Sequence, residues 1–247
     1  MAVRNPKSAA TSLMALFLFL ILAGSPSPAQ AASGSNRWSH PIPVPASAAS
    51  SPPLRRTLQR WNQQQLSNAR ECGRDLQESR PEIKFSKNSD LPYTNQYQVM
   101  FDSPTLYSVA VATELNCGGP YPVLMHKAVS WEVESGRAFD PLTLYRIGTR
   151  QEYGISVLPE IRPMIRQQLI RKARSESKGS DCRKMLQQDK LDSLEPDSIG
   201  LTKSGLYLAM DGVHATAFCY APVFLDHQQI RKYLQPEVAG RIRWPLQ

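Results

Sequence analysis

Four cysteines are the residues of this chain whose chemistry is easiest to specify: Cys72, Cys117, Cys182 and Cys219. A cysteine thiolate attacks a carbonyl carbon when a neighbouring base lowers its pKa. Cys117 stands before Gly118-Gly119, whose backbone amides would suit an oxyanion hole. An even number of cysteines, in a chain that also carries an export signal, instead predicts two disulfides. Four cysteines allow three pairings, and the residues alone do not choose among them.

A metal site is not predicted, because zinc sites need cysteines or histidines at short spacing, such as CxxC or HxxxH. The cysteines lie far apart in the sequence and the histidines are scattered: His40, His126, His214 and His227. His126 falls at a strand position expected to face water. We therefore expect each histidine to be a surface residue, and we expect neither a metal nor a cofactor.

The sequence leaves two alternatives to a binding protein open: a hydrolase with carboxylate catalysts, and a purely structural protein of the cell envelope that has no small ligand. The GxSxG motif of a serine nucleophile is absent. Paired acids need no local motif, so they could come from separate parts of the chain. Glu132 and Glu134 share one face of a predicted strand, but neighbouring exposed acids on a strand are typical of a solvated surface. No catalytic residue is predicted from these patterns.

The N-terminus has the layout of a secretory signal peptide, with cleavage expected after Ala31. Arg4 and Lys7 precede the apolar stretch 13–24, which is too short to span a bilayer. Residues 32–53 are rich in Ser, Ala and Pro and predict a linker, so residues 54–247 would form a single exported domain, periplasmic or secreted.

The formal net charge of +8 favours anionic partners such as envelope polymers or acidic proteins. The chain lacks the mixture of basic and aromatic residues that stacks on bases, so nucleic acid is not an expected partner. Six of the positive charges lie between Arg162 and Lys178. This basic segment is either the solvated face of a helix or a contact for an anionic partner.

The periodicity of apolar residues predicts an α+β fold, with an antiparallel sheet packed against helices. A helix is expected from Pro53 to about Leu76, with Cys72 on its apolar stripe and Gln65 as the one polar interruption of that stripe. Three alternating segments between residues 93 and 134 predict a meander with one buried and one wet face. Cys117 continues the buried face of the second strand.

The second half of the chain predicts helices first and then short strands. Asp140-Pro141 should start a helical turn, and Thr149-Arg150-Gln151-Glu152 has capping-box spacing for a helical region reaching about Arg174. Asp181 and Asp226 are expected to cap later helices. The expected strands are residues 199–201, 206–210, 218–220 and 223–225, with Asp211-Gly212 as a hairpin turn.

Two stretches, residues 93–145 and 199–234, resemble a bacterial extracytoplasmic domain of unknown function. That domain occurs in the ectodomain of the lysozyme-binding anti-sigma factor RsiV and beside peptidoglycan deacetylase domains. The matching features are strands with SP, Gly-Gly and TG(K/R)-like turns, a DLF-like helix start, a GL hairpin, and a last strand that runs into a helix. Here they fall on Ser103-Pro104, Gly118-Gly119, Ser135-Gly136-Arg137, Pro141 to Tyr145, Gly205-Leu206 and Val223 to Leu234.

The resemblance implies an α+β envelope domain that binds rather than catalyses. Its partner would be an extracellular protein or peptidoglycan. The cysteine layout of similar envelope proteins favours the pairs Cys72–Cys117 and Cys182–Cys219. Each pair would join a helix to a core-facing strand position. The chain shows neither an anti-sigma segment nor a deacetylase domain, so we expect a binding domain that does not itself signal across a membrane.

Overall fold

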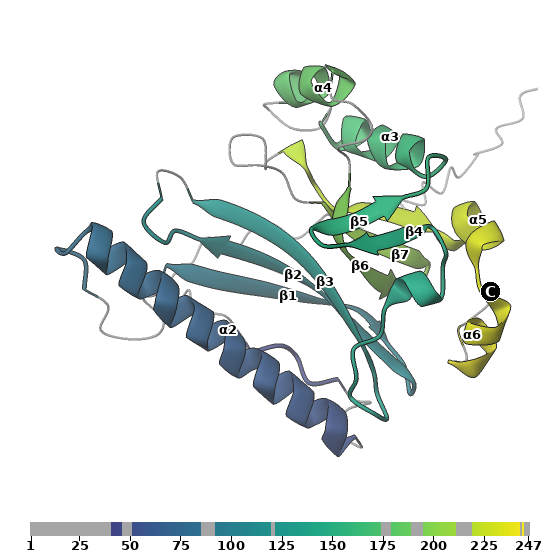
Figure 1. The fold of residues 1–247 in the computed structure, drawn as a ribbon, viewed down its shortest axis with the longest axis horizontal. Helices are drawn as coiled ribbons and strands as arrows, with labels where there is room; N and C mark the ends of the chain where they lie inside the picture. Colours follow the sequence, from purple (N-terminus) through teal and green to yellow (C-terminus); the bar gives the residue numbers. More distant parts are fainter. Residues whose placement is uncertain are drawn as a thin grey trace, which may run out of the picture. The chain divides into compact units, whose positions relative to one another are not determined.

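The fold is built from antiparallel sheets and helices, as the computed structural model in Figure 1 shows. The structure describes residues 41–45, 51–84, 92–119, 122–173, 179–188, 195–210, 219–242 and 244. Contacts group Asn36–Gln247 into one compact unit. The predicted signal peptide, residues 1–31, and the predicted hairpin turn at Asp211-Gly212 lie outside the described residues. In the described part of the chain, no helix combines the length and apolarity that crossing a membrane requires.

Helix α2 (Pro52–Ser79) runs along the meander of β1–β3 (Figure 1). Ser51 caps its first turn by accepting a hydrogen bond from the backbone N–H of Leu54, and Pro52 suits the first helical position. The apolar stripe predicted from the sequence is buried, including Leu54, Leu58 and Cys72. The helix starts inside the segment predicted as a linker.

Part of the predicted linker also packs into the core. Ile42 is 1% exposed and lies in one cluster with Leu54 and Leu58. Its backbone N–H donates to Asn62 Oδ1 at 2.9 Å, and the Tyr107 hydroxyl donates to the carbonyl of Pro43 at 2.6 Å. Residues 41–45 therefore form part of the folded unit.

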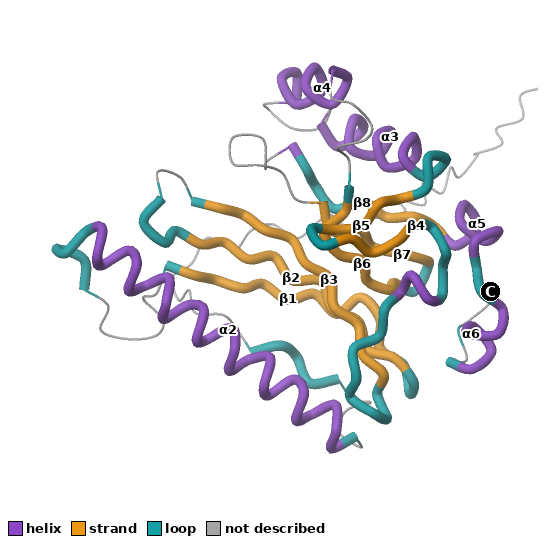
Figure 2. The backbone as a smooth tube through the Cα atoms, viewed as in Figure 1, coloured by secondary structure: helices purple, strands orange, loops and turns teal. Residues whose placement is uncertain are grey.

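The meander consists of β1 (Tyr93–Asp102), β2 (Leu106–Leu115) and β3 (Val123–Glu132), in the order β1-β2-β3 (Figure 2). Its α2-facing side is apolar near the start of the helix, where Tyr107 and Trp131 stack at 6.0 Å between ring centroids. Trp61 of α2 meets Trp131 edge-on at 5.9 Å. These aromatic contacts fix the helix against the sheet.

The prediction that the other face of the meander is wet was wrong for much of its length. Ser108 and Ser130 are 0% and 2% exposed, and Ala110 and Ala128 are also buried. They pack against β6 (Pro196–Thr202) and β7 (Gly205–Met210), where the Ser108 hydroxyl accepts hydrogen bonds from Ser130 Oγ and the Leu201 N–H. Small side chains let the two sheets approach closely. In the sequence, small residues that alternate with larger apolar ones give the same pattern as a strand with one solvated face.

The helix predicted from the capping-box spacing at Thr149 was also wrong at its start. The structure has a hairpin there, with β4 (Gly148–Gln151) paired to β5 (Gly154–Val157). Gly154 has a φ of 138°, which favours glycine, and closes the turn. Ile155 and Val157 are buried at alternate positions, as in a strand. The helix proper is α3 (Arg162–Ala173), and residues 174–178 of the basic segment lie outside the described residues.

The C-terminal part completes the larger hydrophobic core. The sheet order is β6-β7-β8, with β8 spanning Val223–Asp226. Helices α3 and α4 (Gly179–Gln188) pack against this core, with α4 starting before the predicted cap at Asp181. The short helices are η2 (Pro141–Thr143), α5 (His227–Ile230), η5 (Arg231–Tyr233) and α6 (Pro236–Arg241). Asp140 and Asp226 cap η2 and α5 as the sequence predicts, the latter with a complete capping box through Gln229.

Two disulfides cross-link these parts. Cys72 of α2 bonds to Cys117 after β2, and Cys182 of α4 bonds to Cys219 before β8. These are the pairs that the resemblance implies. The turn at Gly118, which has a φ of 96°, lies against the last turn of α2, where an added Cβ would meet Ser79 Oγ at 2.6 Å. The cysteine-glycine stretch is therefore a braced turn.

Candidate ligand-binding site

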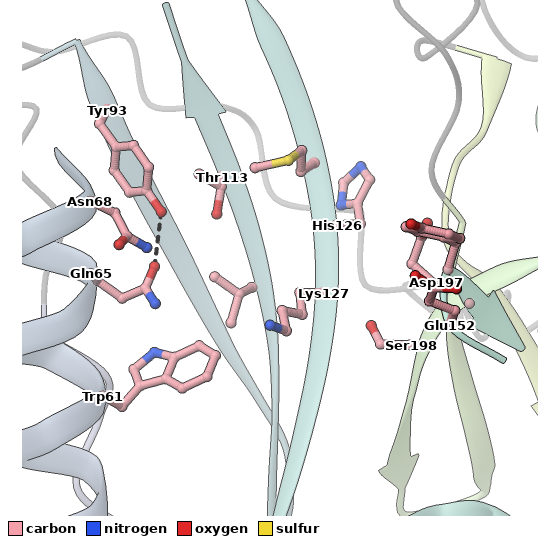
Figure 3. A pocket seen from close by; sticks show the side chains of 14 residues that line it. Trp61, Gln65, Asn68, Tyr93, Thr113, His126, Lys127, Glu152, Asp197 and Ser198 are labelled. Carbon is pink, nitrogen blue, oxygen red and sulfur yellow. Dashed lines mark hydrogen bonds between the residues drawn. The ribbon is translucent and has the colours of Figure 1, made fainter. Parts of the chain in front are cut away.

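A cavity of about 460 Å³ lies around the open edge of β3 (Figure 3). Ligand sites typically measure about 300–1,000 Å³, so its size suits a small molecule or a short peptide. Among the described strands, β3 pairs with β2, and at its end Trp131 also forms an isolated bridge with Ala138. The residues that line the cavity come from α2, β1–β3, the β4–β5 turn and β6: Trp61, Gln65, Asn68, Tyr93, Val111, Thr113, Met125, His126, Lys127, Glu152, Tyr153, Gly154, Asp197 and Ser198.

One wall of the cavity is a polar network between α2 and β1. Gln65 Oε1 accepts hydrogen bonds from the Tyr93 hydroxyl at 2.9 Å and from Asn95 Nδ2 at 3.3 Å. Asn95 is 3% exposed, and its Oδ1 accepts from Thr113 Oγ1 at 2.6 Å. Gln65 interrupts the apolar stripe of α2, and this network explains why the stripe tolerates a polar residue there.

The same wall carries hydrogen-bond donors without acceptors in the described part of the chain. Trp61, Gln65 and Asn68 follow one another on one face of α2. Gln65 bonds through its oxygen only, and Asn68 accepts from Gln64 Nε2 at 2.9 Å through its own oxygen. The indole Nε1 of Trp61 is buried and interacts with the Tyr97 hydroxyl outside normal hydrogen-bond geometry. Lys127 of β3 adds a positive charge, with its Nζ 5.4 Å from the centre of the Trp61 ring.

The opposite wall is acidic and comes from the β4–β5 turn and the start of β6. Figure 3 shows Glu152 and Asp197 on the side of β3 away from α2. Tyr153 stands next to Glu152 and is 85% exposed, so its ring is presented to solvent at the rim. Glu152 and Asp197 are the carboxylates that the structure brings to one cavity, and they lie far apart in the sequence.

The open edge of β3 runs between the two walls. Ser130 and Glu132 turn their backbone groups away from β2, since they bond to Phe139 and Arg137 respectively. Ala128 does the same and donates to Ser198 Oγ at 2.8 Å. Because backbone groups alternate along an antiparallel strand, His126 also directs its N–H and C=O to this edge. No described residue bonds to them.

Burial changes the titration of two groups near the cavity. Burial lowers the pKa of His126, and the positive charge of Lys172 lowers it further, so the imidazole is held neutral to lower pH. Burial raises the pKa of Tyr97, while the side chains of Trp61 and Asn95 oppose that rise. The predicted position of His126 on a wet face was therefore wrong, because the side chain is half-buried beside β6.

Other residues considered for chemistry lie outside the cavity. All four cysteines are in disulfides, so Cys117 offers no thiolate for attack on a substrate. Glu132 accepts a hydrogen bond from Ser135 in an exposed turn. His227 Nδ1 is 2.6 Å from the Tyr145 hydroxyl, which also accepts from Trp244 Nε1, and burial raises the pKa of Tyr145 to about 12. That cluster joins α5 to the C-terminal residues of the core.

Three polar side chains of the basic helix α3 form hydrogen bonds within the fold. Arg166 donates to the carbonyls of Leu186 and Gln187 at 3.1 and 2.7 Å, at the C-terminus of α4. Gln168 bonds to both the N–H and the C=O of Phe224 in β8. Lys172 donates to the Pro222 carbonyl. These contacts favour the interpretation of this segment as a solvated, structural face.

Known proteins resemble this chain in structure rather than in sequence. No family model and no curated protein sequence matches the chain. A DUF3298 family protein from Pseudomonas aeruginosa PAO1 has a similar structure, with 11% identity and a TM-score of 0.39 over 59% of this chain and 63% of that chain. A member of the same family from Bacteroides fragilis NCTC 9343 has 12% identity and a TM-score of 0.43 over 76% of this chain and 73% of that chain. The chain spans less than two thirds of the first of these structures. Both TM-scores are below 0.5, so the likeness decides nothing about the function.

Proposed function

We propose that this chain is an exported, non-enzymatic binding domain of the bacterial envelope, and that its ligand enters the cavity at the edge of β3. The ligand is a cell-wall glycan or a segment of an extracellular protein. The observation that carries the proposal is the lining of this cavity. It combines two aromatic rings with side-chain amides and carboxylates. The rings are those of Trp61 and Tyr153, the amides those of Gln65 and Asn68, and the carboxylates those of Glu152 and Asp197. Ligand pockets typically have this mixture of apolar surface and a few convergent polar groups.

Export is supported by the cysteine chemistry together with the N-terminal sequence pattern. Disulfides form and persist in oxidising compartments, and the structure contains two of them. The basic head, apolar stretch and Ala-Gln-Ala site supply the matching export signal.

Hydrolysis of envelope polysaccharide is the second candidate function, and one observation favours it. Glu152 and Asp197 line the same cavity, as a pair of catalytic carboxylates would. A hydrolase should release soluble fragments from purified peptidoglycan, and Glu152→Gln and Asp197→Asn should each abolish that release. Binding without release of fragments would favour the first proposal.

A co-sedimentation experiment with peptidoglycan and a pull-down with lysozyme test the first proposal. Asn68→Trp should fill the cavity from the surface of α2 and abolish binding. Gln63→Trp is the matched control, because Gln63 is exposed on the same helix and does not line the cavity. Retention of neither ligand by the unaltered protein, or equal binding by both variants, would overturn the proposal.

A further inference from the structure

On the α2 wall of the cavity, the side-chain amides differ in how their oxygen and nitrogen atoms are hydrogen-bonded. The oxygens of Gln65 and Asn68 are both hydrogen-bonded, whereas their amide nitrogens have no acceptor among the described residues. The Lys127 ammonium can act only as a donor. Three side chains, those of Gln65, Asn68 and Lys127, therefore offer N–H groups along this wall.

Free donors at this depth favour an oxygen-rich ligand. A buried donor without an acceptor has a free-energy cost, so native structures seldom leave one without a water molecule or ligand. The half-buried amide nitrogens of Gln65 and Asn68 are donors without an acceptor among the described residues. Lys127 makes a negatively charged oxygen a better ligand for this wall than a neutral carbonyl. A carboxylate meets both conditions.

The other wall has the opposite preference. Glu152 and Asp197 carry acceptor oxygens when ionised, so they favour the ammonium or hydroxyl groups of a ligand. Between the walls, the open edge of β3 presents the backbone N–H and C=O of His126. A peptide bond can pair with these two groups, as an extended peptide does when it adds to a sheet edge.

From this arrangement we infer that the cavity binds a short peptide that carries both a carboxylate and an ammonium group. The carboxylate meets Gln65, Asn68 and Lys127, the peptide backbone crosses the edge of β3, and the ammonium group faces Glu152 and Asp197. The stem peptides of peptidoglycan have this chemistry, whereas its glycan strands supply no ammonium group. The inference rests on the proposed binding function, and it specifies the stem peptide as the part of the cell wall that binds.

Calorimetric titration of the mature chain with defined fragments tests this assignment. The probes are a disaccharide tetrapeptide that contains diaminopimelate, the same compound with its carboxylates amidated, and chitotetraose. We expect the acidic muropeptide to bind, and amidation to weaken binding by about tenfold or more, because charge-assisted hydrogen bonds are lost. Chitotetraose should show no saturable binding.

Matched variants test whether the acidic muropeptide binds in this cavity. Lys127→Met retains the packing of the side-chain stem but removes its charge. It should therefore weaken the binding of the acidic muropeptide and leave the affinity for the amidated compound unchanged. Lys203→Met is the control, because Lys203 is exposed in the turn between β6 and β7. Equal losses in the two variants would overturn the assignment to this cavity.

The possible failures are distinguishable. If chitotetraose binds as tightly as the muropeptide, the inference is wrong and the proposed binding function stands. An unrelated acetylated tripeptide acid that binds equally well would overturn the assignment to peptidoglycan and indicate a protein C-terminus. If neither these probes nor lysozyme binds, the proposed function itself is wrong.

Discussion

Two polar regions of this molecule, helix α3 and the cavity wall of α2, differ in how far their hydrogen-bonding groups are used. Helix α3 is the more conspicuous in the sequence because of its positive charges, but Arg166, Gln168 and Lys172 bond within the fold. The wall on α2 has less charge, but the amide nitrogens of Gln65 and Asn68 have no acceptor among the described residues. The α2 wall, with its unpartnered hydrogen-bonding groups, is therefore our candidate for the binding site in preference to the more highly charged α3.

The disulfides should give the largest effects, because one anchors α2 and the other anchors α4, the helix that packs against α3. Replacing both cysteines of either pair by serine should lower the free energy of unfolding by about 4 kcal/mol, from the entropy of a loop of this size. Urea titration of the unreduced protein measures this loss. Loss of Cys72–Cys117 should also weaken ligand binding, since it ties α2 to the end of β2, whereas loss of Cys182–Cys219 should not. Equal loss of binding in both variants, measured where both are folded, would remove the functional difference between the regions.

A smaller effect is expected at Arg166, where the comparison assigns a purely structural role. Arg166→Met removes two hydrogen bonds to the C-terminal carbonyls of α4 and should cost about 1–2 kcal/mol of stability. Ligand affinity should not change. A variant as stable as the unaltered protein, but with weakened binding, would show that α3 is the interface after all.

The smallest effect should come from the protonation of His126. Its pKa is lowered in the folded state, so the unfolded state binds the proton more readily. Stability should therefore fall as the pH drops below about 6.5, the ordinary pKa of histidine, and level off below the folded pKa. Comparing urea unfolding at several pH values between 7.5 and 5 for the unaltered protein and for His126→Asn isolates this contribution. The pH dependence should be weaker in the variant, and an identical dependence would contradict the burial of His126.

Local patterns in the sequence predicted the elements that depend on near neighbours. The apolar stripe of α2 and the alternation of β1–β3 follow directly from residue spacing, as do the caps at Asp140 and Asp226. The hairpin at β4–β5 was missed because Thr149 and Glu152 imitate a capping box, although Gly154 follows close behind.

The cavity could not be predicted in this way, because it depends on contacts between distant parts of the chain. Gln65 was recognised only as a break in an apolar stripe, and Glu152 only as part of a helix cap. The buried face made by Ser108 and Ser130 was mistaken for a wet one, so the place where β6 meets the edge of β3 was not foreseen. The free donor pattern of the wall emerges only when the hydrogen bonds of Gln65 and Asn68 are known.

One pair of glutamine variants tests the central comparison most directly. Both Gln65→Glu and Gln168→Glu replace an amide nitrogen by oxygen, in α2 and α3 respectively. Titration with the acidic muropeptide and urea unfolding should be measured for each. Gln65→Glu should abolish binding while its oxygen still accepts from Tyr93 and Asn95. Gln168→Glu should retain binding but lose about 1–2 kcal/mol of stability, because it can no longer donate to the Phe224 carbonyl. Unchanged binding in Gln65→Glu, or lost binding in a folded Gln168→Glu variant, would contradict the assignment of the site to α2.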